Sequence, residues 1–289
     1  MQRDCQRSAL VVGSDSVIAK SLINKLQSEG FKTFATSRRN ASIDSLFLDL
    51  LRPEHFEFKE SVDVVYICAA MVSLAQCRDN AELSERINFE APVVLAKKLL
   101  PLCKSLVFLS TSAVFDGKKP QRKETEQTCP ITKYGEDKAR AEAELLALSD
   151  KVSVVRLSKV LTPEYTLFMD WFSKLQLGES IEPFYDLNLC PISLPRVVDC
   201  LLQIACKHLS GVIHLSGYED VSYVDVAHYL VDKLDLPKSR VEAKSAFDCG
   251  IDKTAAPEFS SLDMSSSNLK FGLAFEHWSS LLDQLYLRL

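Results

Sequence analysis

Glycine is scarce in this chain, with nine residues in 289, which leaves few positions for the tight turns of phosphate-binding folds. No low-complexity tract interrupts a composition that is 47% hydrophobic and 25% charged, values typical of globular proteins. No basic cluster offsets the net charge of −5, which argues against a general nucleic-acid binder. The longest apolar run, residues 64–72, is about half of the roughly 20 residues that a membrane span requires. The first ten residues, MQRDCQRSAL, lack the apolar segment of a signal peptide, so we expect no membrane partner.

Paired cysteines and clustered histidines are also missing. The nine cysteines form no CxxC pair, and an odd number of them in a large chain suits a reducing cytoplasm. Cys68 and Cys103 lie within or beside apolar segments, where we expect thiols to act as small core residues. The five histidines show no metal-ligand spacing, so we expect no metal site.

The first 160 residues alternate between short apolar, β-branched runs and stretches with helical spacing of apolar residues. The expected strands are residues 8–13, 31–37, 45–50, 62–70, 105–111 and 152–160. The expected helices are residues 14–28, 81–100 and 134–148. The run 62–70 is almost continuously apolar, as in parallel strands that are buried on both faces. This alternation predicts the α/β class, with a Rossmann-like doubly wound parallel sheet and right-handed crossovers.

The alternation breaks after residue 160. Further helices are expected at 163–177, 194–209, 222–234 and near 275–287, with one strand at 211–217. Ser222 is a plausible N-cap. We therefore predict a dinucleotide-binding domain in residues 1–160, to which 187–217 return. Residues 161–186 and 218–289 would form a smaller, interleaved substrate-binding lobe, whose aromatic residues we expect to be mostly core.

The turn after the first strand has part of a dinucleotide-binding pattern. Gly13 supplies the tight turn, while Ser16 and Ala19 occupy the places of the second and third glycines. The Ser16 hydroxyl, with the amides and positive dipole end of the next helix, suits a pyrophosphate. An ordinary strand–turn–helix would fit these residues equally well.

The end of the second strand favours one cofactor. A fold that selects NAD places Asp or Glu there to bind the ribose 2′-hydroxyl, but here the residues are Ser37, Arg38 and Arg39. Guanidinium groups suit a 2′-phosphate because they make planar bidentate contacts. NADPH is therefore the preferred cofactor, with NADH possible. Solvated surface arginines are the alternative interpretation.

Residues 105–138 carry the strongest chemical signal. An apolar strand ends in hydroxyl residues at Thr111, and a helix then begins at Tyr134 with Lys138 four positions later. Side chains at i and i+4 share a helix face, so a phenol and an ammonium are presented together near a hydroxyl. This pattern predicts proton transfer. The alternative is an exposed helix start with a solvated charge.

These features together resemble a known family. The order Gly13, Ala69-Ala70, Asn88, STSAVFDG at 110–117, YGEDK at 134–138 and Pro257-x-x-Ser260-x-Leu262-Asp263 covers nearly the whole chain. The chain resembles the extended short-chain dehydrogenases/reductases, and within them the dTDP-4-dehydrorhamnose reductase-like group of sugar-nucleotide proteins.

The resemblance implies roles by position. Tyr134 would be the general acid, Lys138 would lower its pKa and bind the nicotinamide ribose, and Thr111 would hydrogen-bond the substrate oxygen. The implied cofactor contacts are Gly13, Ser16, Val17, Ile18, Ser37, Arg38, Arg39, Asp49, Leu50, Ala69, Ala70, Met71, Asn88 and Lys138. The implied substrate contacts are Ser73, Ser112 and Pro257.

Three hypotheses for the function remain open. The first is an NAD(P)H-dependent reductase of a keto group on a nucleotide-activated sugar or a similar carbonyl substrate. The second is an NAD-dependent sugar-nucleotide epimerase, and the third is a non-catalytic nucleotide-binding regulatory subunit. Dehydration is not expected, because no acidic pair stands beside Thr111. A cytoplasmic location and a homodimer complete the expectations.

Overall fold

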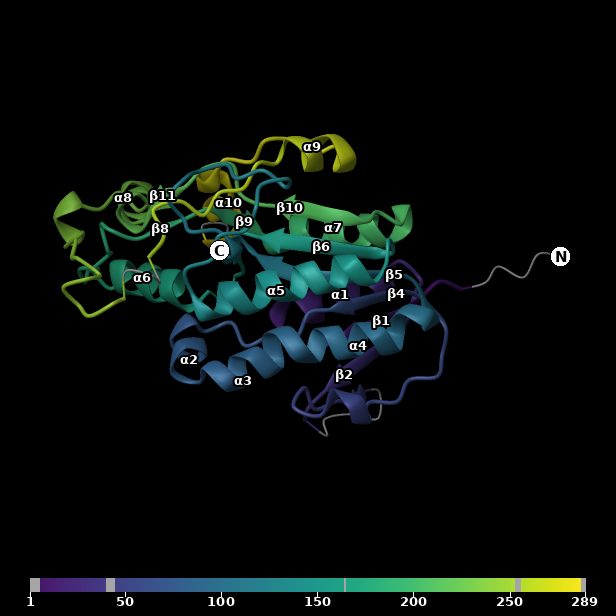
Figure 1. Ribbon diagram of the computed structural model, residues 1–289. Helices are drawn as coiled ribbons and strands as arrows, with labels where there is room; N and C mark the ends of the chain where they lie inside the picture. The colour runs from purple at the N-terminus through teal and green to yellow at the C-terminus, as the bar shows by residue number, and fades with distance from the viewer. Residues whose placement is uncertain (1–5, 40–44, 164, 253–255, 287–289) are drawn as a thin grey trace. The chain divides into compact units, whose positions relative to one another are not determined.

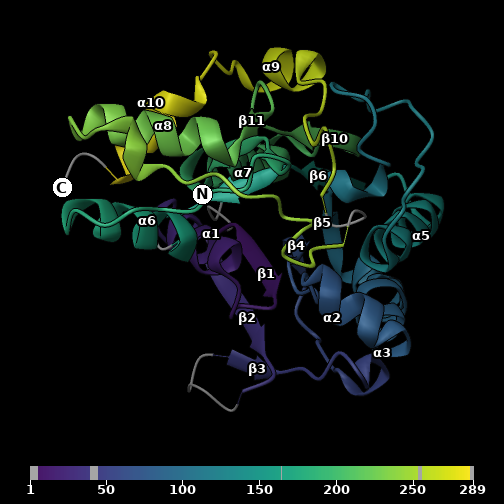
Figure 2. The ribbon, with the colours of Figure 1, turned by 90° about the vertical axis from the view of Figure 1, so that its left-hand side faces the viewer.

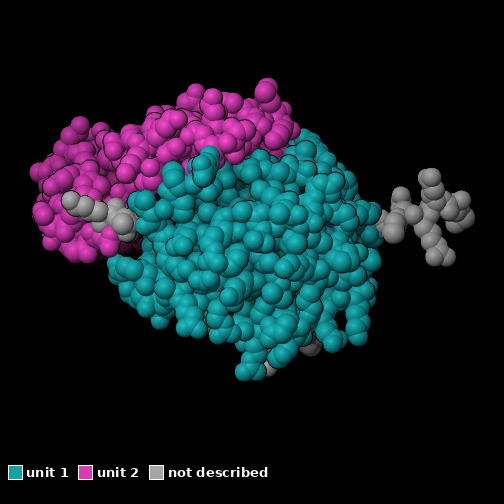
Figure 3. Space-filling view, viewed as in Figure 1, with its two compact units in different colours: residues 1–114, 127–156, 195–213 teal, residues 115–126, 157–194, 214–289 magenta. Residues whose placement is uncertain are grey.

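The structure is a computed structural model that describes residues 6–39, 45–163, 165–252 and 256–286 (Figure 1). Cys5 therefore lies outside the described residues, as does the last residue of the helix expected near 275–287. By contacts, the chain divides into two compact units, coloured separately in Figure 3. Unit 1 comprises residues 1–114, 127–156 and 195–213, and unit 2 comprises residues 115–126, 157–194 and 214–289. The dinucleotide-binding and substrate-binding roles of the two predicted domains remain predictions.

A seven-stranded sheet, in the order β10-β6-β5-β4-β1-β2-β3, forms the centre of unit 1 among the described residues. The pairs β1–β2, β1–β4, β2–β3 and β4–β5 are parallel, and β1, β2 and β3 follow one another toward one edge (Figure 2). This is the strand order of dinucleotide-binding folds with one strand added, so the predicted fold class is confirmed. The strands are β1 (Ser8–Val12), β2 (Lys32–Ser37), β3 (Ser45–Phe47), β4 (Val62–Ile67), β5 (Cys103–Thr111), β6 (Val152–Leu157) and β10 (Gly211–Leu215).

Helices cover both faces of the sheet. On one face, α1 and α7 lie together, since Lys25 Nζ pairs with Asp199 Oδ1 at 3.2 Å, and the Tyr66 hydroxyl of β4 donates to the Leu201 carbonyl at 3.1 Å. On the other face, α4 and α5 lie side by side (Figure 1). The helical elements of this unit are α1 (Val17–Ser28), η1 (Pro53–His55), α2 (Leu74–Asp79), α3 (Ala81–Glu85), η2 (Arg86–Glu90), α4 (Ala91–Leu99), η3 (Leu100–Leu102), η4 (Ser112–Val114), α5 (Lys133–Leu148) and α7 (Leu194–Lys207).

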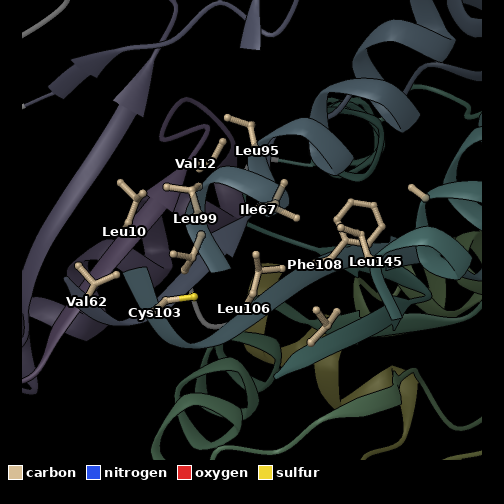
Figure 4. Packing of buried hydrophobic residues seen from close by; sticks show 14 of the residues in the cluster. Leu10, Val12, Val62, Ile67, Leu95, Leu99, Cys103, Leu106, Phe108 and Leu145 are labelled. Carbon is tan, nitrogen blue, oxygen red and sulfur yellow. The ribbon is translucent and has the colours of Figure 1, made fainter. Parts of the chain in front are cut away.

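The core beneath α4 and α5 follows from the alternation of side chains along each strand. Leu10 and Val12 of β1 point to this face and lie near Leu95 and Leu99 of α4, while Leu145 of α5 lies farther along the same cluster (Figure 4). All five side chains are at most 1% exposed. Because β1 is buried on both faces, its sequence reads as a continuous apolar run and not as an alternation.

Two expected elements differ in detail. The helix expected at 81–100 contains a π-helical turn, η2, and is preceded by a separate short helix, α2, that the sequence did not predict. The strand expected at 152–160 ends at Leu157, and residues from Lys159 form another strand, β7, in unit 2. In both cases the local apolar pattern continues across the break, so it carried no signal of one.

Within its described residues, unit 2 has two small two-stranded sheets and its own apolar cluster. Phe168 and Trp171 of α6 are at most 4% exposed and pack with Tyr223 and Tyr286, as expected of core aromatics. Ser222 accepts a hydrogen bond from Asp225 N and caps α8, as predicted. The elements are β7 (Lys159–Leu161), α6 (Thr166–Gln176), β8 (Asn188–Leu189), β9 (Pro191–Ser193), β11 (Val221–Ser222), α8 (Tyr223–Lys233), η5 (Lys238–Arg240), α9 (Ser265–Phe271) and α10 (Trp278–Tyr286).

Within the described ranges, no helix has both the length and the apolar character that crossing a membrane would require.

Candidate active site

A cavity of about 560 Å³ opens at the carboxyl ends of β1, β2 and β4, all within unit 1. In doubly wound sheets this is the edge at which ligands bind. Its volume is in the range of small-molecule and cofactor sites. Of the residues implied by the resemblance, those that line it are Gly13, Ser16, Ser37, Arg38, Asp49, Leu50, Ala69, Ala70, Met71 and Ser73.

The glycine turn keeps the conformation that a dinucleotide needs. Gly13 has φ +88°, and a Cβ there would lie 2.5 Å from Ala69 Cβ, so only glycine fits between β1 and the end of β4. Ser16 caps α1 by accepting a hydrogen bond from Ala19 N at 3.1 Å. Val17 and Ile18 follow in α1 but do not line the cavity, and Val17 is 49% exposed. The predicted contacts of these two side chains therefore lack support in the geometry.

The end of β2 holds a charged corner. The Ser37 hydroxyl, itself buried, donates to Asp15 Oδ2 at 2.9 Å and accepts from Arg39 N at 3.0 Å. Arg38 and Asp15 both line the cavity, whereas Arg39 is exposed outside its lining. Asp49 Oδ1 accepts from Leu51 N at 3.0 Å and so fixes the turn that borders the cavity.

Asn88 has a role that differs from the predicted cofactor contact. It lies fully buried in η2, and its side chain bonds both backbone groups of Met71, with Met71 N to Oδ1 at 2.9 Å and Nδ2 to Met71 O at 3.0 Å. It does not line the cavity. Asn88 therefore stabilises the cavity wall without lining it, because its two hydrogen bonds fix the loop that follows β4. The π-helical turn, a feature frequent at functional sites, places this side chain there.

Thr111, Tyr134 and Lys138 are brought together as predicted. The Thr111 side chain lies near enough to the Tyr134 phenol to lower its pKa, and Thr111 Oγ1 accepts a hydrogen bond from Ala113 N at 3.1 Å. Lys138 is 1% exposed; its Nζ donates to the Leu109 carbonyl at 2.6 Å and lies 3.6 Å from the centre of the Phe108 ring. The strand end and one helix face thus present the hydroxyl, the phenol and the amine at one place.

The charge states of this group differ from the expectation. Burial raises the pKa of Tyr134 well above its usual value near 10, against the smaller lowering effect of the Thr111 hydrogen bond. Burial also lowers the pKa of Lys138 to about 7, although the negative charge of Glu142 opposes this. The predicted lowering of the Tyr134 pKa by Lys138 is absent in this structure, because the amine is bonded to the strand carbonyl and is itself desolvated. Tyr134 consequently keeps its proton at neutral pH.

A glycine and a cap set the position of Tyr134. Helix α5 begins at Lys133, one residue earlier than expected, because Thr132 caps it by accepting from Gly135 N at 3.0 Å. A Cβ on Gly135 would lie 2.0 Å from the Ala113 carbonyl oxygen. The first turn of α5 therefore packs directly against the backbone of η4, which follows Thr111.

A buried ionic network beneath the site was not predicted. The Glu142 carboxylate accepts from Arg156 Nη2 at 2.7 Å and Nε at 3.1 Å, and the Ser110 hydroxyl bonds it as well. Glu142 lies four residues after Lys138 on the same helix, and Arg156 is the one charge in the apolar strand VSVVRL. The lone charge of Arg156 in an otherwise apolar strand was the signal that could have revealed the pair.

The remaining predicted residues are the three substrate contacts. Ser73 caps α2 by accepting from Gln76 N at 3.3 Å, and Ser112 begins η4 next to Thr111. Pro257 belongs to unit 2, where it lies against Gly117. Substrate roles for these three residues remain predictions.

The family follows from a comparison over almost the whole chain. A model of the family described as "RmlD substrate binding domain" matches residues 7–289. The chain belongs to this family. The resemblance drawn from the motifs is therefore confirmed.

The proteins that are similar to this chain carry different names. A probable low-salt glycan biosynthesis reductase of Haloferax volcanii is 26% identical over 73% of this chain and 72% of its own length. Methionine adenosyltransferase 2 subunit beta of Bos taurus is 22% identical over 81% of this chain and 74% of its own length. A dTDP-4-dehydrorhamnose reductase of Bacillus anthracis, solved in complex with NADP, superposes with a TM-score of 0.81 and 20% identity, covering 98% and 100% of the two chains. That structural likeness confirms the fold.

Proposed function

We propose that this protein is an NADP-dependent oxidoreductase of the short-chain dehydrogenase/reductase type that reduces a keto group on a nucleotide-activated sugar. The observation that carries the proposal is the closeness of Thr111, at the end of β5, to the Tyr134 phenol, with Lys138 four residues along the same helix as Tyr134. The Cys77 thiol, near enough to Tyr134 to affect its pKa, donates to the Met71 carbonyl at the cavity wall, so the pair lies close to the cavity. Family membership and the reductase among the relatives support the same chemistry.

The cavity suits a dinucleotide with a 2′-phosphate. Gly13 leaves the turn open for close approach of a backbone to a pyrophosphate, and the capped start of α1 presents its amides there. Arg38 lines the same cavity with a guanidinium that matches phosphate geometry. When bound, NADPH would supply the hydride.

The chain's own residues would handle the proton. Tyr134 holds its proton at neutral pH, as a general acid must before it protonates a carbonyl oxygen. Thr111 would hydrogen-bond the same oxygen, a role supported by its closeness to the phenol. Lys138, on the same helix as Tyr134, is held by its hydrogen bond to Leu109 O and would bind the nicotinamide ribose.

The test replaces only the phenolic hydroxyl. In Tyr134→Phe, we expect turnover of keto-sugar nucleotides with NADPH to fall by about 10²- to 10⁴-fold, the usual contribution of general acid catalysis, while NADPH affinity stays unchanged. Cofactor affinity by calorimetry and turnover by NADPH absorbance would be measured on the same preparations. Carbonyl reduction by the variant at the wild-type rate would rule out the proposed role of Tyr134.

A second candidate function rests on a different observation. The beta-subunit relative matches over a larger share of this chain than the glycan reductase does. A nucleotide-binding regulatory subunit would bind NADPH yet turn over no member of a keto-sugar nucleotide panel. It would also bind a methionine adenosyltransferase catalytic subunit in a pull-down, an outcome that the reductase proposal does not predict.

Three further parts of the proposal concern the setting. The eight cysteines within the described residues are free thiols, which fits the proposed cytoplasmic location. The substrate contacts are proposed to come from unit 2, including Pro257. A homodimer is proposed and would be tested by sedimentation velocity.

A further inference from the structure

An acidic side chain lies at the end of β2, although no acid follows that strand in the sequence. Asp15 belongs to the turn between β1 and α1, and its carboxylate reaches across to accept the Ser37 hydroxyl at 2.9 Å. Both residues line the cavity. In dinucleotide-binding folds an acid at this place bonds the ribose 2′-hydroxyl and disfavours a 2′-phosphate. In this chain, the acid at the end of β2 therefore comes from a different element, the turn between β1 and α1.

The carboxylate is held there by a buried anchor. Ser37 is 4% exposed, and its hydroxyl accepts from Arg39 N at 3.0 Å while donating its only proton to Asp15. With that proton committed, Ser37 has no donor left for a phosphate. The sequence-based expectation that Ser37 contacts a 2′-phosphate is therefore weakened by the presence of Asp15.

The opposite charges of Arg38 and Asp15 lie in the lining of one cavity but are not paired with each other. Arg38 lines the same cavity as Asp15, yet among the residues that the structure describes Arg38 forms no ion pair. A 2′-phosphate entering here would meet the attraction of Arg38 and the repulsion of Asp15 at once. A 2′-hydroxyl would lose the attraction of Arg38, but it could donate a hydrogen bond to Asp15.

We propose that Asp15 is a specificity-determining residue that offsets Arg38, so that the cavity accepts NADH as well as NADPH instead of strongly selecting NADPH. The inference rests on the proposed function, because it assumes that the cavity binds a nicotinamide dinucleotide. It assigns to Asp15 a role in cofactor choice that the pattern at the end of β2 does not reveal.

The expected effect follows from charge. A phosphate monoester carries nearly two negative charges at pH 7, so removing one nearby carboxylate charge relieves repulsion against both. Asp15→Asn keeps the shape and an oxygen that can accept from Ser37. We expect NADPH to bind about tenfold more tightly to this variant, and NADH to bind equally or up to about tenfold more weakly because a hydrogen bond to a charged acceptor is lost.

The experiment measures the dissociation constants of both cofactors by calorimetry for the full-length wild type, Asp15→Asn, Arg38→Ala and a control. The control is Glu29→Gln, which makes the same change in net charge at the opposite end of α1. We expect the ratio of the NADH to the NADPH dissociation constant to rise at least tenfold in Asp15→Asn and to fall about tenfold in Arg38→Ala. Glu29→Gln should leave the ratio unchanged. Circular dichroism verifies folding of each variant, and Asp15 is exposed, so its replacement does not threaten the core.

Two negative results are distinguishable. If both cofactors bind but the ratio is the same in wild type and Asp15→Asn, or shifts equally in Glu29→Gln, the role of Asp15 is overturned and the proposed function stands. If neither cofactor binds to any folded variant or to the wild type, the proposed function and this inference both fail.

Discussion

The replacement Glu142→Gln tests whether the buried network supports the candidate site. Glu142 and Arg156 have side chains that are 3% and 5% exposed, and their closest nitrogen and oxygen atoms are 2.7 Å apart. Through Ser110, the network is attached to the strand end that carries Leu109 and Thr111. The variant keeps the size of the side chain and removes only its charge, so the buried Arg156 guanidinium loses the carboxylate that it pairs with.

The magnitude follows from the burial of the pair. Breaking a buried ion pair by removing one partner costs about 3–5 kcal/mol, because the remaining charge stays desolvated. The amide oxygen of glutamine recovers one hydrogen bond to Arg156, worth roughly 1 kcal/mol. We therefore expect Glu142→Gln to lower the free energy of unfolding by about 3 kcal/mol. Replacing both partners with apolar residues, Glu142→Leu together with Arg156→Met, should cost much less, since neither charge then stays buried alone.

Urea unfolding followed by circular dichroism measures the difference. The matched control is Glu85→Gln, which breaks pairs with Lys133 and Arg140 at a site where the Glu85 side chain is 34% exposed. Partly exposed pairs contribute about 0–1 kcal/mol, so this variant should differ little from wild type. Equal losses of stability in the two single variants would refute the reasoning, because burial would then not decide the cost.

Three other predictions concern the turn and the helix start. Gly13→Ala should abolish NADPH binding measured by calorimetry, because its Cβ would lie 2.5 Å from Ala69 Cβ at a backbone with φ +88°; retained affinity would contradict this. Gly135→Ala should reduce turnover by about 10²-fold with cofactor affinity intact, since relieving its 2.0 Å contact with Ala113 O displaces α5 by about an ångström; unchanged turnover would show that the helix does not need to move. Burial lowers the pKa of Lys138 from 10.5 to about 7, so between these values the unfolded chain binds more protons and stability rises with pH. In urea unfolding at pH 7.5 and 8.5, wild type should gain up to about 1.4 kcal/mol relative to Lys138→Met, and parallel pH profiles would count against a depressed pKa.

The central sheet was predictable because its strands are buried on both faces. Runs such as those at β1 and β4 are apolar without alternation, and the helices between them have 3.6-residue spacing, so each element has its own local signature. The π-helical turn η2 could not be predicted in the same way. It coincides with the hydrogen bonds of Asn88 to the Met71 backbone, a long-range contact that leaves the helical spacing of apolar residues unchanged.

The candidate site was predictable to the extent that one segment carries it. Thr111, Tyr134 and Lys138 lie within 28 positions, and strand end and helix start bring them together by local geometry. The contacts of Glu142, Arg156 and Asp15, by contrast, are made with residues of other elements. The position of Asp15 at the end of β2 depends on the pairing of β1 with β2, which places the turn of one strand beside the end of the next. Patterns within a single segment contain no information about that neighbour.

The glycine turn bears on whether this chain is an enzyme or a subunit that kept only the fold. Its sequence departs from the usual glycine pattern at Ser16, but the hydroxyl turns back to cap α1 and satisfies one of the amides that a helix start leaves unbonded. Gly13 persists at the one position where a Cβ would collide with Ala69. The turn is therefore altered in composition, but Gly13 keeps the positive φ of a tight turn, and the Thr111 side chain still lies near the Tyr134 phenol. If the proposed cofactor turn and proton donor are correct, a loss of turnover in this chain would be traced first to the residues that recognise the substrate.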